Sequence, residues 1–302
     1  MLNNWNKMSE IEKFAKIWQI QLNVEYKKPQ KNIRISFKDV GPFCEYLALD
    51  FAPGYKGGGS GGMGYDLYNK SETKAIEVKS CCTIQNWKCK KCDAKFNNLF
   101  MDHCPDCGGN DFGVVDDSRF SINAREILRQ YDKDIFGGFI FSHISEQEQI
   151  KSKNVLVVKV EWFKLNFDDD PDLKKIRLTY FINQRDKGAK DNNNLLPYSF
   201  DFYKLAPQKV CEMYININYA DLNAKPKITK KLTSSYPRVD GSVLRKKEYE
   251  LFKKLDSFDP KTNTAEAKDF TLNIPYRSKS LGKDRGDTRA RLDKALKNKV
   301  EI

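Results

Sequence analysis

Apolar side chains near the N-terminus recur at the three- and four-residue spacing of an amphipathic helix. The positions are Trp5, Met8, Ile11, Phe14, Ala15, Trp18 and Leu22. Ser9 and Glu12 also match the capping-box pattern, so Ser9 is an alternative start for this helix. The aromatic residues among these positions are interpreted as core packing.

A second, shorter helix is predicted over residues 42–49, and its core-facing side chains are predicted to be Phe43, Tyr46 and Leu47. A glycine-rich stretch follows over residues 57–64. Residues 59–64 formally match G-x-G-x-x-G, but a strand follows them where a dinucleotide site requires a helix. The lysine of a phosphate-binding P-loop is missing too, so both nucleotide-binding interpretations are rejected.

Strand patterns dominate the next part of the chain. Residues 65–68 and 75–79 flank a turn-rich stretch and predict an antiparallel hairpin. Residues 137–144 and 155–163 are rich in β-branched and aromatic side chains, which favours two further strands. With a helix predicted over residues 123–132, the first half combines helices with a sheet of about four strands, an α/β arrangement.

The second half has a weaker pattern. Its predicted strands cover residues 177–183 and 213–219, and its predicted helices cover residues 242–255 and 287–300. We therefore expect a core over residues 1–165 and an additional α+β region over residues 166–302.

The charge of the chain narrows its function. There are 53 Lys and Arg against 41 Asp and Glu among 302 residues, a formal net charge of +12. Such a balance favours a polyanionic partner, because each cation that meets a phosphate releases a counterion. No apolar stretch approaches the roughly 20 residues of a membrane-spanning helix, and the N-terminus does not match a signal peptide. We expect a cytoplasmic protein that does not bind membranes.

Candidate catalytic residues lie in the predicted hairpin. Asp66 is followed after ten residues by Glu77-Val78-Lys79. On a strand Glu77 and Lys79 point to the same face, and pairing with the strand of Asp66 would bring two carboxylates and an ammonium together. Carboxylates are ligands for Mg²⁺, and the lysine would orient or deprotonate an attacking water.

These residues resemble the PD-(D/E)XK nuclease superfamily, in particular the type II restriction endonucleases. The resemblance covers roughly residues 40–165, and the proline that often precedes the aspartate is replaced by Tyr65. It implies a central mixed sheet flanked by helices, with catalytic Asp66, Glu77 and Lys79. Many members add a helix-borne glutamate, for which Glu45 is the best match and Glu12 the alternative.

The same resemblance implies a biochemical role. It predicts Mg²⁺-dependent, sequence-specific hydrolysis of double-stranded DNA, with Asp66, Glu77 and Glu45 as Mg²⁺ ligands. It also implies a cognate DNA methyltransferase that acts on the same site. Paired cuts in a palindrome would favour a homodimer with two-fold symmetry.

Four cysteines indicate a structural metal site. Cys89-x2-Cys92 and Cys104-x2-Cys107 are separated by eleven residues, and paired knuckles of this kind hold Zn²⁺ tetrahedrally. A zinc ribbon is therefore predicted as an insertion over residues 86–112. His103 is a weaker alternative ligand, and the other four cysteines are expected to be ordinary buried residues.

Several basic and polar residues are candidates for DNA contact. They are Lys88, Lys90 and Lys91 on the ribbon, Arg119 before the predicted helix at residues 123–132, Asn123 at its start, and Arg285 and Arg289 near the C-terminus. Solvated surface lysines are an equally good interpretation of each ribbon position. Residues 166–302 are expected to serve DNA recognition as a clamp.

Other functions stay open at this point. One is a DNA repair nuclease that recognises structure instead of sequence, and another is a non-catalytic zinc-ribbon DNA-binding or regulatory protein. An HNH-type nuclease needs a catalytic histidine, and neither His103 nor His143 lies in a convincing motif.

Overall fold

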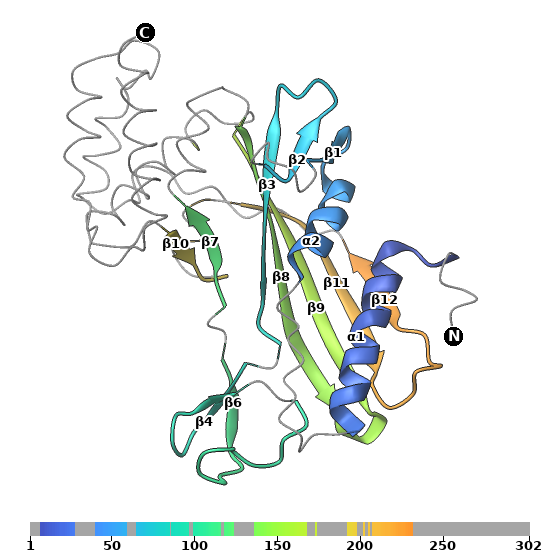
Figure 1. Ribbon diagram of the computed structural model, residues 1–302, viewed down its shortest axis with the longest axis vertical. Coiled ribbons are helices and arrows are strands. Elements are labelled where there is room, and N and C mark those ends of the chain that lie inside the picture. The colour runs from blue at the N-terminus through green and yellow to red at the C-terminus, as the bar shows by residue number, and fades with distance from the viewer. Residues whose placement is uncertain are drawn as a thin grey trace, which may run out of the picture.

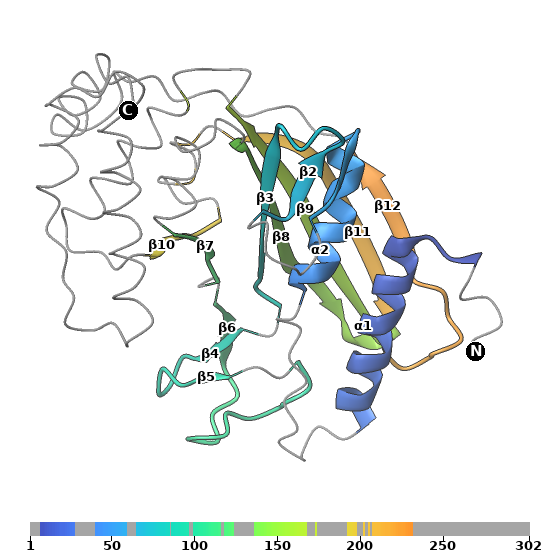
Figure 2. The same cartoon turned by 45° about the horizontal axis from the view of Figure 1, so that its top comes forward.

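Figure 1 shows the structure, a computed structural model, and Figure 2 shows it turned by 45°. The structure describes residues 7–27, 40–58, 65–84, 86–96, 99–115, 118–123, 136–167, 173, 192–197, 202, 205 and 207–231. The predicted elements at residues 177–183, 242–255 and 287–300 lie outside these ranges, as do residues 124–132 of the predicted helix.

Helix α1 (Glu10–Lys27) begins at the capping box. The backbone N–H of Ser9 donates to Glu12 Oε2 at 2.7 Å, and the Ser9 hydroxyl donates to the same oxygen at 2.8 Å. The start at Ser9 is therefore confirmed. Phe14, Trp18 and Leu22 of α1 are buried against the sheet.

Helix α2 (Gly41–Ala48) is confirmed, but its predicted orientation is partly wrong. The helix buries Cys44, Leu47 and Ala48, whereas the Tyr46 side chain is 53% exposed. Side chains two positions apart on a helix point about 200° away from each other. Docking through Cys44 and Ala48 therefore turns Tyr46, which lies between them in sequence, outward. A short 3₁₀ turn, η3 (Leu49–Phe51), follows.

A seven-stranded mixed sheet forms the centre of the molecule. Its order is β1 (Tyr55–Gly57), β2 (Leu67–Asn69), β3 (Ala75–Cys82), β8 (Phe136–Ile150), β9 (Val155–Asn166), β11 (Gln208–Asn218) and β12 (Lys227–Lys231). Only the β3–β8 pair among these is parallel. The predicted α/β class and mixed sheet are confirmed, and the hairpin at Asp66 is the β2–β3 pair.

The sheet is larger than the sequence pattern suggests. β1 comes from a short polar stretch with no strand pattern, and β11 and β12 come from beyond residue 166. The β8–β9 hairpin turns through a 3₁₀ segment, η4 (Lys151–Lys153). The division of the chain near residue 165 stays a prediction. Two strands that follow this point, β11 and β12, complete the central sheet.

Gly138 marks an irregularity where the parallel pair begins. Its φ is +147°, and a Cβ there would collide with the carbonyl oxygen of Leu165. The β3–β8 register shifts at the same place, between Ala75 and Ile76. Glycine is needed here because other residues have neither this backbone conformation nor the space.

The two faces of the sheet differ. α1 and α2 cover one face, as Figures 1 and 2 show, and pack on Ile76, Val78 and Ile140. The other face carries stacked and edge-on aromatic rings, including Phe139 and Phe141. A parallel pair requires a long connection between its strands. Between β3 and β8 this connection contains a small three-stranded sheet and β7 (Phe120–Asn123).

The three-stranded sheet has the order β5 (Lys95–Phe96), β4 (Trp87–Cys89) and β6 (Phe112–Val114). β7 pairs instead with β10 (Asn192–Leu195). No helix in the described part of the chain is long and apolar enough to cross a bilayer.

Candidate active site

Strand β3 supplies Glu77 and Lys79. Val78 between them packs into the core beneath α1 and α2, so alternation directs both neighbours to the opposite face. Glu77 is only 7% exposed. Lys79 Nζ lies 2.5 Å from Glu77 Oε1, a short ion pair.

Asp66 lies on the neighbouring chain segment, one residue before β2. Its Oδ2 accepts a hydrogen bond from the backbone N–H of Val78 at 2.7 Å. The carboxylate of Asp66 is therefore tied to β3 at the residue between Glu77 and Lys79. The predicted convergence of Asp66 with the strand of Glu77 and Lys79 is present in the structure.

The start of the glycine-rich stretch contacts the backbone of Asp66. The backbone N–H of Gly58 donates to the Asp66 carbonyl oxygen at 2.7 Å. A Cβ at Gly58 would collide with the carbonyl oxygen of Tyr65. Sequence reasoning did not identify Gly58, and the only signal was its place in the glycine run.

Glu45 approaches the same site from α2. Burial raises the pKa of Glu45, the negative charge of Asp66 raises it further, and the positive charge of Lys79 opposes the rise. Glu45 and Asp66 line one cavity of about 520 Å³, with the exposed Tyr46 and Gly58 also in its wall. Glu45 thus lies in the electric field of Asp66 and Lys79, while Glu77 and Lys79 are not among the residues that line this cavity.

Glu12 is held elsewhere. Backbone and side-chain hydrogen bonds from Ser9 lower the pKa of Glu12, as expected for the acid of a capping box. It lines a separate cavity with Lys16 and Lys225. Glu45, not Glu12, lies beside Asp66.

The four cysteines of the predicted ribbon form one cluster. Their sulfur atoms all lie within 4.8 Å of one another. Cys89 Sγ lies 3.6 Å from Cys107 Sγ, and Cys92 Sγ lies 3.6 Å from Cys104 Sγ. A tetrahedral zinc with Zn–S bonds of about 2.3 Å requires sulfurs about 3.8 Å apart, whereas a disulfide requires about 2.05 Å. The thiols therefore fit Zn²⁺ and are not disulfide-bonded.

The chain around the cysteines is shaped for a metal. Desolvation raises the pKa of Cys89, but hydrogen bonds from the backbone N–H groups of Cys92 and Lys91 outweigh it and lower the pKa. At Cys92 the backbone N–H of Ala94 lowers the pKa, but the neighbouring thiols and desolvation outweigh it and raise the pKa. Asp93 and Gly108 adopt positive φ in the two turns. Phe96 and Cys104 are buried with Cys89 in a core of their own. Small domains with a core of this size commonly depend on a bound metal for stability.

The candidate DNA-binding residues have mixed surroundings. Lys88 pairs with Asp93 at 2.6 Å and Lys90 with Asp111 at 2.8 Å, while Lys91 is exposed. Arg119 is exposed immediately before β7. Arg285 and Arg289 lie outside the described residues.

The predicted helix start at Asn123 is wrong. Ser121 and Asn123 belong to β7 and pair with Asn194 and Asn192 of β10. The pairing partner comes from about 70 residues further along the chain, so local sequence gave no sign of it. Asn123 therefore lies in a strand, and residues 124–132, on which a helix N-terminus at this point would depend, lie outside the described residues.

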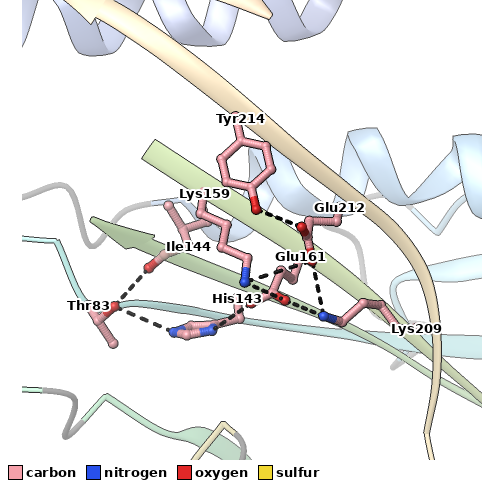
Figure 3. A network of polar contacts seen from close by, with 8 residues as sticks. All are labelled: Thr83, His143, Ile144, Lys159, Glu161, Lys209, Glu212 and Tyr214. Atoms are coloured by element: carbon pink, nitrogen blue, oxygen red, sulfur yellow. Dashed lines mark hydrogen bonds and ion pairs between the residues drawn. The ribbon is translucent and has the colours of Figure 1, made fainter. Parts of the chain in front are cut away.

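A second polar cluster lies on the sheet face of Glu77 and Lys79 (Figure 3). Glu161 is buried, and its carboxylate lies 2.5 Å from Lys209 Nζ and 3.0 Å from Lys159 Nζ. His143 lies 3.7 Å from the other oxygen. Desolvation raises the pKa of Glu161, but contacts with His143, Lys209 and Lys159 outweigh it and lower the pKa to about 2. Glu212 lies 3.1 Å from Lys209 Nζ and 3.8 Å from Lys159 Nζ, so two carboxylates face the two lysines and the cluster satisfies its own charges.

The match to a family model decides the identity. Residues 39–238 match the model described as MamI restriction endonuclease. The chain belongs to the MamI restriction endonuclease family. The matched range contains Glu45, Asp66, Glu77, Lys79 and all four cysteines of the ribbon. No curated protein and no solved structure matches the chain.

Membership of the MamI restriction endonuclease family makes the chain a nuclease that acts on DNA. It supports a type II restriction endonuclease and gives the basic charge of the chain an explanation. A purely DNA-binding regulatory protein does not agree with this family. The HNH alternative has no support, because His143 is buried in the cluster around Glu161.

Proposed function

We propose that the protein is a type II restriction endonuclease that hydrolyses double-stranded DNA at a specific sequence with Mg²⁺ at the Asp66–Glu77–Lys79 centre. The observation that carries the proposal is the hydrogen bond from Val78 N–H to Asp66, which ties one acid to the strand of the other two groups.

Asp66, Glu77 and Glu45 are the proposed Mg²⁺ ligands. Mg²⁺ prefers hard oxygen ligands and is commonly held by one or two carboxylates together with water and substrate phosphate. When bound, Mg²⁺ supplies positive charge at the phosphate and lowers the pKa of a coordinated water. Burial and then the negative charge of Asp66 raise the pKa of Glu45, which fits this role because a bound cation would stabilise the charged carboxylate.

Lys79 is proposed to orient the attacking water and to offset negative charge that develops on the phosphate. Its Nζ is held by Glu77, so the ammonium is already directed towards the acidic centre. Glu77 thus both binds Mg²⁺ and positions Lys79. Tyr46 stands at the rim of the cavity, where its exposed ring is available to DNA.

The ribbon and the C-terminal region are proposed to bind DNA. Zn²⁺ at the four cysteines would hold the ribbon rigid within a short stretch of chain after β3, which supports contact with the DNA being cut. Lys91 and Arg119 are the exposed candidates among the described residues. The roles of residues 166–302, Arg285 and Arg289 in recognition remain proposals from sequence.

Plasmid digestion tests the function. Pure protein with Mg²⁺ should convert a sequenced plasmid into discrete fragments whose ends share one sequence. A continuous smear would contradict sequence specificity and favour the structure-directed repair nuclease. A plasmid that stays intact with every metal ion and salt concentration tested would contradict the proposed nuclease activity.

A cognate methyltransferase is proposed as the partner in the cell. Methylation of the mapped recognition sequence should protect the plasmid from cutting, while methylation of an unrelated sequence should not. Equal cutting of both plasmids would contradict a restriction–modification role.

A further inference from the structure

Apolar side chains are exposed on one side of α1. Among the residues that the structure describes, five large apolar side chains are exposed, and four of them belong to this helix. Ile17 is 39% exposed, Ile20 is 41% exposed and Val24 is 45% exposed. Their spacing of three and four residues places them within about 60° of arc on the helix surface. The fourth, Tyr26, points elsewhere and contacts the rings of Phe100 and Tyr219.

The exposed stripe continues at both ends with charged residues. Together the positions Glu10, Lys13, Ile17, Ile20, Val24 and Lys27 form the α1 seam. The intervals along the seam are three, four, three, four and three residues, which is the a/d repeat of a coiled coil. The opposite side of α1 already packs on the sheet through Phe14, Trp18 and Leu22. A helix with two apolar sides is suited to pack against a second partner.

The charges of the seam identify the partner. Glu10 lies at the start of the seam and Lys27 at its end. If two copies of α1 pack antiparallel about a two-fold axis, Ile17 meets Ile20 of the other copy. Glu10, whose Oε1 pairs with Lys13 Nζ of the same helix at 2.7 Å, then also meets Lys27 of the other copy, and the aliphatic part of Lys13 covers its Val24. A parallel pair would instead place like charges together, so the seam is self-complementary only in the antiparallel arrangement.

We propose that the α1 seam is the interface of a two-fold symmetric dimer of this chain. The same surface of both copies is used, which is the property of a closed isologous dimer. The edge of the sheet beside α1 is poorly suited to this purpose, because β12 carries Lys227, Lys230 and Lys231 and lysines guard sheet edges against pairing. A helix pair about 27 Å long is smaller than a standard interface, so the dimer should form in the micromolar range.

Sedimentation velocity of the zinc-loaded full chain, without DNA or Mg²⁺, tests the proposal. The mass should rise from 35.0 kDa towards twice that value as the protein concentration increases through the micromolar range. Ile20→Glu should abolish the increase. Lys70→Glu, an exposed change in the β2–β3 turn, should leave it unchanged. Thermal unfolding of each variant checks that the fold is kept.

A charge exchange tests the antiparallel register. Glu10→Lys alone and Lys27→Glu alone should each weaken the dimer about fivefold to tenfold, and the double variant should restore it. A monomer at every concentration, or a dimer that Ile20→Glu leaves intact, would overturn the proposal. So would a double variant weaker than both single variants. These results do not depend on cleavage, so the interface and the nuclease proposal fail separately.

Discussion

At the residue scale, the candidate site consists of acids whose surroundings favour protonation or a cation. Burial and the charge of Asp66 both raise the pKa of Glu45. A divalent cation beside Glu45 would lower this pKa again, because it stabilises the charged carboxylate. Glu45 is therefore proposed to act as a metal ligand, a role that packing of α2 on the sheet does not require of it.

Glu45→Gln should impair Mg²⁺ binding more than it destabilises the fold. The change keeps the size of the side chain but removes one anionic ligand, so we expect half-maximal cleavage to need about tenfold more Mg²⁺. Titration of the cleavage rate with Mg²⁺ measures this. Glu12→Gln is the matched control, because that acid caps α1, and it should leave the Mg²⁺ dependence as it was. Identical titrations for Glu45→Gln and the natural protein would contradict its role as a ligand.

Glu146 on β8 offers a separate test, through stability. Burial raises the pKa of Glu146 to about 7. The folded state therefore binds more protons than the unfolded state between about pH 4.5 and pH 7, and stability falls as the pH rises through that window. Glu146→Gln should remove this loss and raise the stability at pH 8 by about 1–3 kcal/mol, at about 1.4 kcal/mol per pKa unit.

Thermal or urea unfolding at pH 5 and at pH 8 measures the effect of Glu146→Gln. The gain should be present at pH 8 and small at pH 5, where the carboxyl group of the natural protein is already neutral. Glu148→Gln, two residues further along β8 on its exposed part, is the control. Equal gains at both pH values would contradict the assignment of the effect to a buried carboxylate.

At the element scale, β3 is the part of the fold on which the site depends. Its alternation directs Val78 into the core and Glu77 and Lys79 to the other face, and its pairing with β2 brings Asp66 alongside. The sequence pattern predicted this hairpin because apolar residues surround the E-x-K motif. It did not predict that Tyr46 is exposed, because the docking face of a short helix is decided by tertiary contacts.

Gly138→Ala should destabilise the sheet where the parallel β3–β8 pair begins. The backbone conformation is strained for alanine and the new Cβ would meet Leu165, so we expect a loss of about 2–4 kcal/mol in the free energy of unfolding. Denaturant unfolding provides the measurement. Gly41→Ala, at a position with no atom near the added Cβ, should change the free energy little. Similar free energies of unfolding for Gly138→Ala and Gly41→Ala would contradict the steric requirement for glycine at position 138.

Zinc removal should affect the ribbon before the central sheet. The ribbon has its own small core of Cys89, Phe96 and Cys104, which is separate from the main core. We expect about one zinc per chain by elemental analysis. Chelation or Cys92→Ser should expose the backbone amides of β4–β6 to hydrogen exchange while β8 and β9 stay protected. Cys211→Ser, a buried cysteine outside the cluster, should keep the zinc. A zinc-free protein with a protected ribbon would contradict the structural role.

At the scale of the whole molecule, residues far apart in the chain complete one sheet. β11 and β12 extend it beyond β9, and β10 pairs with β7 across about 70 residues. Local periodicity predicted β8, β9 and part of β11, since each has a long apolar pattern. It missed β7, β10, β1 and β12, because strands this short are defined by their pairing partners. The cysteine spacing was the strongest signal, since four thiols at two knuckles leave few alternatives.

The sequence suggested the members of the candidate site, whose catalytic role stays a proposal, but not the contacts that support them. Asp66, Glu77 and Lys79 followed from the motif, and Glu45 from the resemblance. The hydrogen bond of Asp66 to Val78 and the close approach of Gly58 required three-dimensional structure. The candidate DNA contacts were the least predictable, because an exposed lysine looks the same in sequence whether it meets solvent, an aspartate or a phosphate.

Single-turnover cleavage of plasmid DNA by Glu77→Gln and Lys79→Ala tests the central claim most directly. Both variants should lose at least about 100-fold in rate while still binding the cleaved sequence with Ca²⁺ in place of Mg²⁺. Glu72→Gln, an exposed acid in the same hairpin that pairs with Lys56, should cut at the natural rate. If Glu77→Gln and Lys79→Ala both cut as fast as Glu72→Gln, the catalytic centre is not where the account places it.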